Sequence, residues 1–298
     1  MTDPVLFNRR LSKSELNTWI SLVESQTDSG CMNRALAADF LELEDTLSFV
    51  SSVDDEMIGG TAIYKDRTRL GMILASVAIK KEFREISAYN IIKSSLPFFR
   101  VVAIRDIDAL IPDDTSKERL AFPGSFELDL WTKSVLERIG FEEKSKLFSY
   151  SIPLQGENQQ RHVENKWDSH TNIENAKKLI WDSSKTAGMT NSLVWTAFDF
   201  AVNQGNLRSV TLKDSMKLVT SIYYSGKTAI IGLIISDDDF TEDGMASSLV
   251  AEMIRETDAE KLILPLIGDG QDKLIEALAD ELGGSLKRRS MTLMRKQL

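Results

Sequence analysis

The chain has few of the residues that metal and thiol chemistry require. Its 298 residues include one cysteine, Cys31, and two histidines, His162 and His170. A single cysteine cannot form an intramolecular disulfide or a cysteine-based zinc cluster, and nothing near Cys31 in sequence would activate it as a nucleophile. Both histidines lie in the polar stretch Gln155–Thr171, which we interpret as a linker. A Ser-His-Asp triad and a histidine-ligated metal are therefore not expected, and we predict no metal cofactor.

Long apolar runs and clustered positive charge are also lacking. No apolar stretch approaches the roughly 20 residues that span a bilayer, and residues Met1–Arg10 lack the apolar core of a signal peptide. We therefore expect a cytoplasmic protein without a membrane partner. The net charge of −9 argues against nucleic acid as a partner. It suits a basic substrate, or solubility alone.

What is present is a strand-turn-helix passage that occurs twice. Each copy opens with an apolar run typical of a buried strand and continues into a helix with an apolar face. Each is followed by a second amphipathic helix that ends at a glycine and by a strand-like tail. The strands are Met72–Ile79 and Ala229–Ile235, the turns are Phe83–Ala88 and Phe240–Ala246, the helix ends are Leu136–Phe141 and Ala279–Gly284, and the tails are Lys146–Ile152 and Ser290–Arg295.

The two copies differ in length because of one insertion. The polar, Pro/Gly-bounded stretch Asp113–Phe126 in the first copy has no counterpart in the second. A repeat of this size should bury its own core, and 298 residues suffice for two ordinary cores. We predict two domains, residues 1–154 and 172–298, joined by a linker over 155–171.

Each half is predicted to be of the α/β (α+β) class, with a mixed, mostly antiparallel sheet flanked by helices. Asp54-Asp55-Glu56 should form a hairpin turn. The predicted helices are Ser12–Ser25, Asn33–Leu43, Ile173–Lys185 and Leu193–Gln204, and the predicted strands are Leu47–Val53, Met57–Tyr64, Leu70–Ile79, Val101–Leu110, Leu218–Tyr224, Lys227–Ile235 and Lys261–Leu266.

This order of elements resembles the GNAT superfamily of N-acyltransferases. In that family a Gln/Arg-x-x-Gly-x-Gly/Ala turn holds the pyrophosphate of acyl-coenzyme A, and the preceding strand pairs with the pantetheine arm. Arg84-Glu85-Ile86-Ser87-Ala88-Tyr89 matches at the arginine and departs at both glycines, whereas Thr241-Glu242-Asp243-Gly244-Met245-Ala246 keeps Gly-x-Ala and lacks the Gln/Arg. The resemblance implies acetyl-coenzyme A, or another acyl-coenzyme A, as co-substrate.

Electrostatics favours the first copy as the coenzyme site. A helix N-terminus attracts a pyrophosphate, and Lys80, Lys81 and Arg84 add positive charge, although the bulky Tyr89 could obstruct it. In the second copy the turn is Gly244, Met245 and Ala246; Gly244 and Ala246 allow close approach, but five carboxylates surround them. The predicted coenzyme-binding residues are Val77, Ala78, Ile79, Arg84, Glu85, Ile86, Ser87, Ala88 and Tyr89. The alternatives are that Arg84 is a solvated turn residue and that the acids are an ordinary helix start.

Acyl transfer to an amine needs a base for the ammonium proton and an acid for the leaving thiolate. In the resembling family the acid is often a tyrosine four residues before the glycine of the Gly-Phe step. Here the position is Leu136 in the first copy and Ala279 in the second. Asp106 and Asp108, on one face of a strand, are candidate bases or amine anchors, and Tyr150 is a candidate acid, with Tyr64 and Tyr89 as further tyrosines. The alternatives are a strand-end cap for the acids and half-buried core positions for the tyrosines.

Two functions follow from these features. The first is an acyl-coenzyme A-dependent N-acyltransferase in which an amine of unspecified identity attacks the thioester directly. The second is a catalytically silent binding or regulatory protein built from two degenerate copies. The basic turn favours the first, and the missing glycines and acid tyrosines favour the second.

Overall fold

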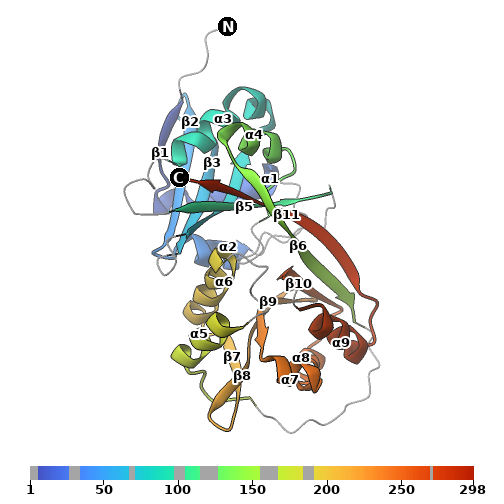
Figure 1. The fold of residues 1–298 in the computed structure, drawn as a ribbon. Coiled ribbons are helices and arrows are strands. Elements are labelled where there is room, and N and C mark those ends of the chain that lie inside the picture. The colour runs from blue at the N-terminus through green and yellow to red at the C-terminus, as the bar shows by residue number, and fades with distance from the viewer. Residues whose placement is uncertain are drawn as a thin grey trace. The chain divides into compact units, whose positions relative to one another are not determined.

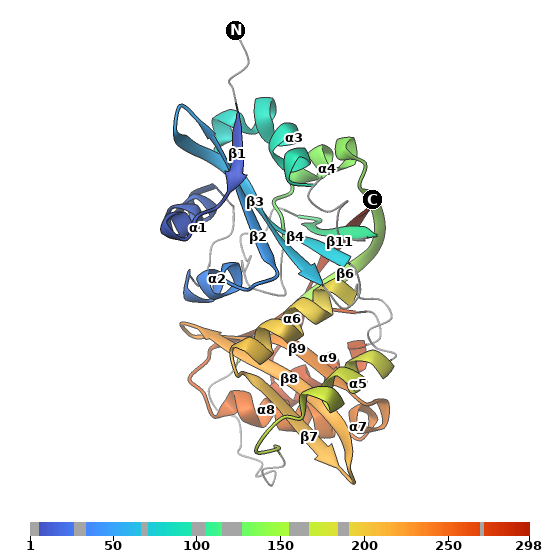
Figure 2. The same cartoon turned by 90° about the vertical axis from the view of Figure 1, so that its left-hand side faces the viewer.

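The computed structural model describes residues 6–26, 34–66, 71–96, 105–114, 127–154, 167–183, 191–268 and 271–298. The chain forms two compact units (Figures 1 and 2). Unit 1 comprises Met1–Lys146 and Met291–Leu298, and unit 2 comprises Leu147–Ser290. Among the described residues, no helix is long and apolar enough to cross a membrane.

Unit 1 is a mixed sheet with helices on both faces. The sheet order is β1 (Phe7–Arg10), β2 (Thr46–Val53), β3 (Glu56–Asp66), β4 (Gly71–Ile79), β5 (Asp106–Pro112) and β11 (Lys287–Gln297, paired from Met291). Only the β4–β5 pair is parallel. One face packs against η1 (Lys13–Glu15), α1 (Leu16–Gln26) and α2 (Arg34–Leu41), and the other against η2 (Lys81–Phe83), α3 (Arg84–Ser95) and α4 (Thr132–Ile139) (Figure 2).

Unit 2 has the same plan. Its sheet order is β6 (Glu142–Pro153), β10 (Lys261–Ile267), β9 (Thr228–Ser236), β8 (Ser215–Ser225) and β7 (Leu207–Leu212), with β9 and β10 parallel. Helices α5 (Ile173–Asp182) and α6 (Asn191–Asn203) cover one face, and α7 (Asp238–Glu242), α8 (Met245–Arg255) and α9 (Asp272–Leu282) cover the other.

Hairpin turns and β-bulges recur at matching positions in the two units and confirm the predicted repeat. The hairpin turns Asp54-Asp55 and Lys213-Asp214 have positive φ at both residues (48° and 64°, 49° and 64°), as a two-residue turn between twisted strands requires. Register shifts leave one extra residue in β4, Ala75, and one in β9. That second bulge lies at Gly232.

Both second helices end at a left-handed glycine. Gly140 (φ 99°) terminates α4 and Gly283 (φ 66°) terminates α9, so that the last carbonyls of each helix are bonded by the amides that follow. These two glycines align the C-terminal parts of the units.

The predicted domain boundaries, 1–154 and 172–298, differ from the structure in the last strand of each half. Both tails are strands, as predicted, but Met291–Gln297 pairs with β5 in unit 1 and Pro153–Phe148 pairs with β10 in unit 2. The two halves thus exchange their final strands. Alternation along a strand reports its two faces and carries no information about its neighbour, so the exchange has no signal in the sequence pattern.

Part of the predicted linker lies within the described residues. Residues 155–166, which include His162, lie outside the described residues. Asp168 is hydrogen-bonded to β7: its carboxylate accepts from Ser209 Oγ (2.6 Å) and Thr211 Oγ1 (2.8 Å). The end of this stretch therefore packs on unit 2. The prediction missed β7 itself and β1, which are short edge strands; all four residues of β1 are exposed.

Candidate functional site

The strands of unit 1 separate beside the turn that the sequence singled out. β4 pairs with β5 over three residues only, from Gly71–Asp106 to Ile73–Asp108. Beyond Ile73 β4 stays paired with β3, while β5 stays paired with β11. The edge of β4 from Leu74 to Ile79 is thus released from β5, and released strand edges can pair with an extended ligand.

A bulge marks this edge. Ala75 is the extra residue of β4, and bulges re-aim backbone groups and are frequent next to active sites. Val77 follows two residues later, and β9 repeats the arrangement with Gly232 and Ile234. The same separation occurs in unit 2, because β9 and β10 pair only over three residues, up to Ile230–Ile263.

The two released edges differ in what occupies them. In unit 2 the buried Gln271 (1% exposed) donates its Nε2 to the carbonyl oxygen of Ile234 at 2.6 Å. Counted back from the glycine that ends each helix, the residue of unit 1 that corresponds to Gln271 is Leu128, which cannot donate. No described side chain donates to the Val77 carbonyl. A protein side chain therefore closes the edge of unit 2, and its counterpart in unit 1 is apolar.

Arg84 begins α3 and is held by unit 1 itself. Its Nε donates to the carbonyl of Ile79 (3.1 Å) and its Nη2 to the carbonyl of Gln26, and its guanidinium lies 4.6 Å from the centre of the Trp131 ring. The buried carboxylate of Asp129 is 3.9 Å away. With 17% of its side chain exposed, Arg84 is not the solvated turn residue of the alternative interpretation. It fixes the start of α3 and contributes positive charge there.

The other predicted coenzyme residues fall into three groups. Val77, Ala78 and Ile79 are buried in β4. Ser87 and Ala88 are each 1% exposed inside α3, and the Ser87 hydroxyl has no hydrogen-bond partner. Glu85 and Ile86 are exposed, Ile86 at 58%.

Tyr89 lies in a cluster of cations. Lys93 Nζ donates to its hydroxyl at 3.0 Å, and the Arg138 guanidinium is 5.2 Å from its ring centre. These positive groups, Lys93 first, lower the pKa of Tyr89. The side chain is thus held toward α4.

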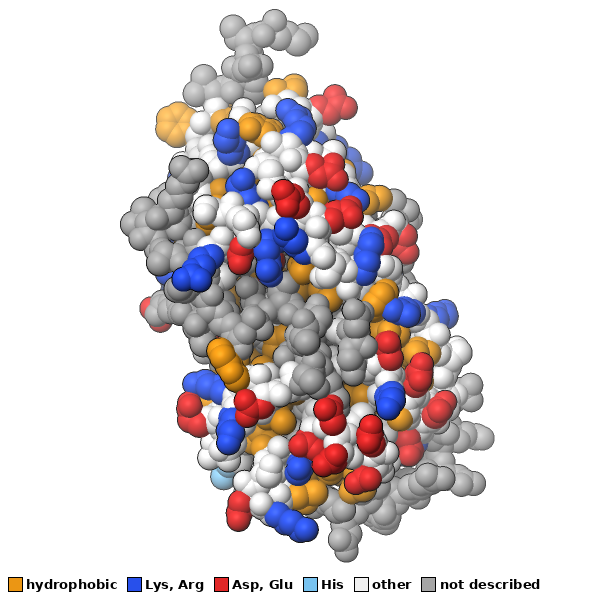
Figure 3. Space-filling view, viewed as in Figure 1, with side chains coloured by type: hydrophobic (Ala, Val, Ile, Leu, Met, Phe, Trp, Pro, Cys, Tyr) orange, Lys and Arg blue, Asp and Glu red, His pale blue; other side chains and the backbone are white. Residues whose placement is uncertain are grey.

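The corresponding turn of unit 2 carries its own anion. The Asp237 carboxylate caps α7 by accepting from the backbone amide of Phe240 (3.4 Å) and pairs with Lys217 (3.2 Å). Gly244, with φ of 70°, then starts α8 and places Met245 and Ala246 in its first turn. Four acids of this turn are exposed, Asp238, Asp239, Glu242 and Asp243. Figure 3 shows acidic side chains gathered on the visible face of unit 2.

Asp108 is a structural carboxylate. It is 1% exposed and accepts two hydrogen bonds from Arg295, from Nε at 2.7 Å and from Nη2 at 3.1 Å. Asp106 lies 4.0 Å from the same guanidinium. β5 begins at Asp106, so both acids stand at the start of the strand, where β4 and β5 are still paired.

Tyr150 belongs to unit 2, not to the first domain as predicted. Its hydroxyl donates to Asp272 at 2.8 Å, and burial followed by this bond raises its pKa well above the usual range. The exchanged strand β6 carries it there. Leu136 and Ala279 are buried at 0% and 4%, as apolar core residues of their helices.

Asp113, the first residue of the predicted insertion, follows the C-terminal end of β5. Lys146 Nζ lies 2.8 Å from both carboxylate oxygens, and Thr292 donates to one of them at 2.6 Å. The Pro112–Asp113 step at the strand end was the available signal. In the part of the chain that the structure describes, no group of His, Cys, Asp and Glu is arranged to hold a metal ion.

Comparison with known proteins rests on structure alone. No family model matches the chain, and no curated protein matches its sequence. Similar solved structures include a proposed acetyltransferase from Pyrococcus horikoshii (TM-score 0.67, 13% identity, covering 100% of this chain and 90% of that one). A tandem GNAT protein from the clavulanic acid biosynthesis pathway gives a TM-score of 0.65 at 10% identity, covering 98% of each chain. A GCN5-related N-acetyltransferase from Sphaerobacter thermophilus gives 0.62 at 11%, covering 98% and 95%. At identities this low the structural similarity shows the fold alone: the chain has two GNAT-like folds in tandem.

Proposed function

We propose that the chain is an acyl-coenzyme A-dependent N-acyltransferase in which unit 1 binds the coenzyme. The observation that carries the proposal is the difference between the two released edges. The edge of unit 1 has a bulge at Ala75 and no side-chain donor on Val77, whereas Gln271 occupies the same place in unit 2. An amide-bearing pantetheine arm could pair with the former without displacing protein.

The turn after β4 supplies the charge that a pyrophosphate needs. Lys81 has no ion-pair partner among the described residues, and Arg84 stands at the start of α3. The unpartnered hydroxyl of Ser87 lies in the first turn of that helix and can donate to an oxyanion. The carboxylates of the corresponding turn in unit 2 would repel the same group.

The reaction forms one carbon–nitrogen bond and breaks the carbon–sulfur bond of the thioester. The attacking amine loses a proton, and the leaving thiolate gains one. The Leu136 side chain cannot supply the proton that the thiolate gains, so we assign this proton to solvent. Acetyl-coenzyme A is the expected donor of the acyl group.

A catalytically silent binding protein is the second candidate. It is favoured by the engagement of the candidate acid and base: Asp108 is bonded to Arg295, and Tyr150 to Asp272. Such a protein would bind the coenzyme in unit 1 and leave its thioester intact.

Calorimetric titration with acetyl-coenzyme A, followed by a thiol-release assay against a panel of amines, tests both. We expect the wild type to bind one equivalent of acetyl-coenzyme A and the Lys81→Glu variant to bind it more weakly. Lys13→Glu makes the same charge change at the exposed η1 and should leave binding unchanged. Binding without thiol release for any amine would favour the silent protein. Absence of binding by the wild type at millimolar coenzyme, or loss of binding on Gly244→Glu alone, would overturn the assignment to unit 1.

A further inference from the structure

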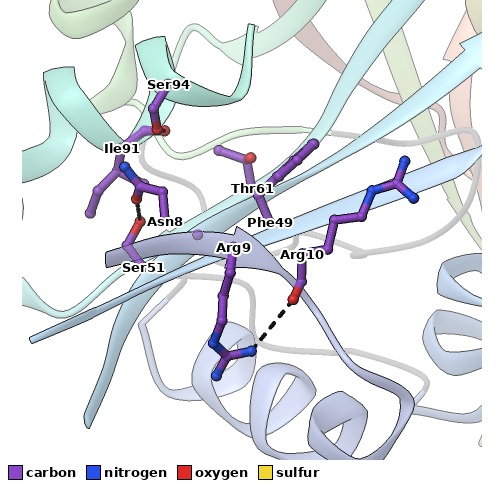
Figure 4. A pocket seen from close by; sticks show the side chains of 9 residues that line it. Asn8, Arg9, Arg10, Phe49, Ser51, Thr61, Ile91 and Ser94 are labelled. Atoms are coloured by element: carbon purple, nitrogen blue, oxygen red, sulfur yellow. Dashed lines mark hydrogen bonds between the residues drawn. The ribbon is translucent and has the colours of Figure 1, made fainter. Parts of the chain in front are cut away.

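Unit 1 contains a cavity, lined by both polar and apolar side chains, that is separate from the released edge of β4. It lies between β1, β2 and β3 on one side and the C-terminal half of α3 on the other, and its volume is about 170 Å³ (Figure 4). Its lining residues are Asn8, Arg9, Arg10, Phe49, Ser51, Gly60, Thr61, Ile91 and Ser94. A cavity of about 150 Å³ holds a benzene molecule, so this one can take a ligand of about six non-hydrogen atoms.

Thr61 gives the cavity an unused hydrogen-bonding group. Its side chain is fully buried (0% exposed), yet Oγ1 has no hydrogen-bond partner. Register places Thr61 between Phe49 on β2 and Val77 on β4, in the row of side chains that faces α3. A buried hydroxyl without a partner is costly, and it therefore points to a group that fills the cavity.

The fold does not require this arrangement. Thr220 is the counterpart of Thr61 in unit 2, because each is the sixth residue after its hairpin turn. Thr220 Oγ1 donates to the carbonyl of Leu233 at 2.8 Å. The threonine hydroxyl is thus hydrogen-bonded to the backbone in unit 2, whereas in unit 1 it has no partner and the threonine lines a cavity.

The lining indicates the chemistry of a ligand. Asn8 accepts from Ser51 through Oδ1, which leaves its Nδ2 as a donor. Ser94 already donates to the carbonyl of Ile91 (2.9 Å). Arg10 adds positive charge at the rim, while Phe49 and Ile91 form apolar wall. Donors beside an apolar wall fit a short aliphatic chain that ends in a carboxylate.

We propose that this cavity binds a short-chain carboxylate, whose oxygens accept hydrogen bonds from Asn8 Nδ2 and Thr61 Oγ1. The alkyl group packs between Phe49 and Ile91. Butyrate has the matching size, and its neutral amide, butyramide, has the same shape without the charge.

Thermal unfolding and two-dimensional amide NMR of the full chain, with butyrate or butyramide added, test the proposal. We expect butyrate to raise Tm with concentration and to shift the Asn8 side-chain amide signals, with a smaller effect of butyramide. Thr61→Val should raise Tm without ligand, because the unpartnered hydroxyl is gone, and should weaken butyrate binding about ten-fold or more. Asn8→Asp should abolish binding through charge repulsion.

Thr220→Val is the matched control. It replaces the same hydroxyl group by a methyl group, but at a position where the hydroxyl has a hydrogen-bond partner. Thr220→Val should therefore lower Tm and leave butyrate binding unchanged. Equal stabilisation by butyramide would contradict a carboxylate ligand. Failure of butyrate to bind the wild type, or undiminished binding to Thr61→Val, would overturn the site.

Discussion

Replacing Arg295 by leucine tests whether the last strand of the chain belongs to unit 1. Arg295 lies on β11 directly opposite Asp108 of β5 and donates two hydrogen bonds to its carboxylate. The variant would remove both of these hydrogen bonds and the positive charge of Arg295 from a carboxylate that is 1% exposed. Removing one partner of a buried ion pair costs about 3–5 kcal/mol, a large share of the ~5–15 kcal/mol that stabilises a typical domain.

For a unit of this size each kcal/mol lowers Tm by about 2–4 °C. The expected loss is therefore roughly 6–20 °C for the transition of unit 1. The double variant Asp108→Leu/Arg295→Leu removes both charges and should recover most of the loss, because an apolar pair of similar volume can replace a buried ion pair.

Hydrogen exchange read by mass spectrometry locates the effect. Arg295→Leu should speed exchange in peptides of β4 and β5 and leave those of β9 unchanged. Arg288, on the same strand, lies 3.4 Å from the centre of the Phe148 ring in unit 2. Arg288→Leu is thus the matched control and should act on unit 2 only, by about 0.5–1 kcal/mol. Faster exchange in β9 and β10 on Arg295→Leu, with β4 and β5 unchanged, would refute the strand exchange.

Two further predictions concern stability. The Arg9 guanidinium, followed by Ser12, lowers the pKa of Glu15 to about 2, so Glu15 stabilises the fold above its ordinary pKa of about 4.5 and loses this effect as pH falls toward 2. Urea melts should therefore find Glu15→Gln less stable than the wild type at pH 7, by no more than the ~0.2–1 kcal/mol of a surface ion pair, and equal to it near pH 2; a gap that persists at pH 2 would contradict the pairing. Gly60→Ala would place a methyl group against the carbonyl oxygen of Phe49 and 2.9 Å from the Trp19 ring, and overpacking with the resulting backbone shift should lower the free energy of unfolding by about 1–3 kcal/mol. Gly205→Ala, where nothing lies within 4 Å, should cost only the strain of its positive φ, and equal losses in the two variants would contradict the close packing at Gly60.

The sequence predicted what depends on local pattern. Apolar runs located β4 and β9, and the hairpin at Asp54-Asp55 and the helix ends at Gly140 and Gly283 were found because particular backbone conformations favour particular residues. These local signals were enough to establish the repeat and its fold.

Long-range partners were not predictable in the same way. Arg84 was chosen as a phosphate ligand from its place in a motif, but its contacts, Gln26, Asp129 and Trp131, come from distant segments. The partner of Asp108, Arg295, lies on the exchanged strand β11, and the exchanged strand β6 brings Tyr150 to Asp272 of α9. Each side chain was correctly placed on an element, and the neighbour of that element decided its role.

Amide exchange in the presence of saturating acetyl-coenzyme A tests the central claim most directly. We predict protection of peptides within Gly71–Ser95, which carry the released edge of β4 and the start of α3, and no change within Thr228–Arg255 of unit 2. Protection confined to Thr228–Arg255 would contradict the claim that Gln271 closes that unit and that unit 1 is the coenzyme site.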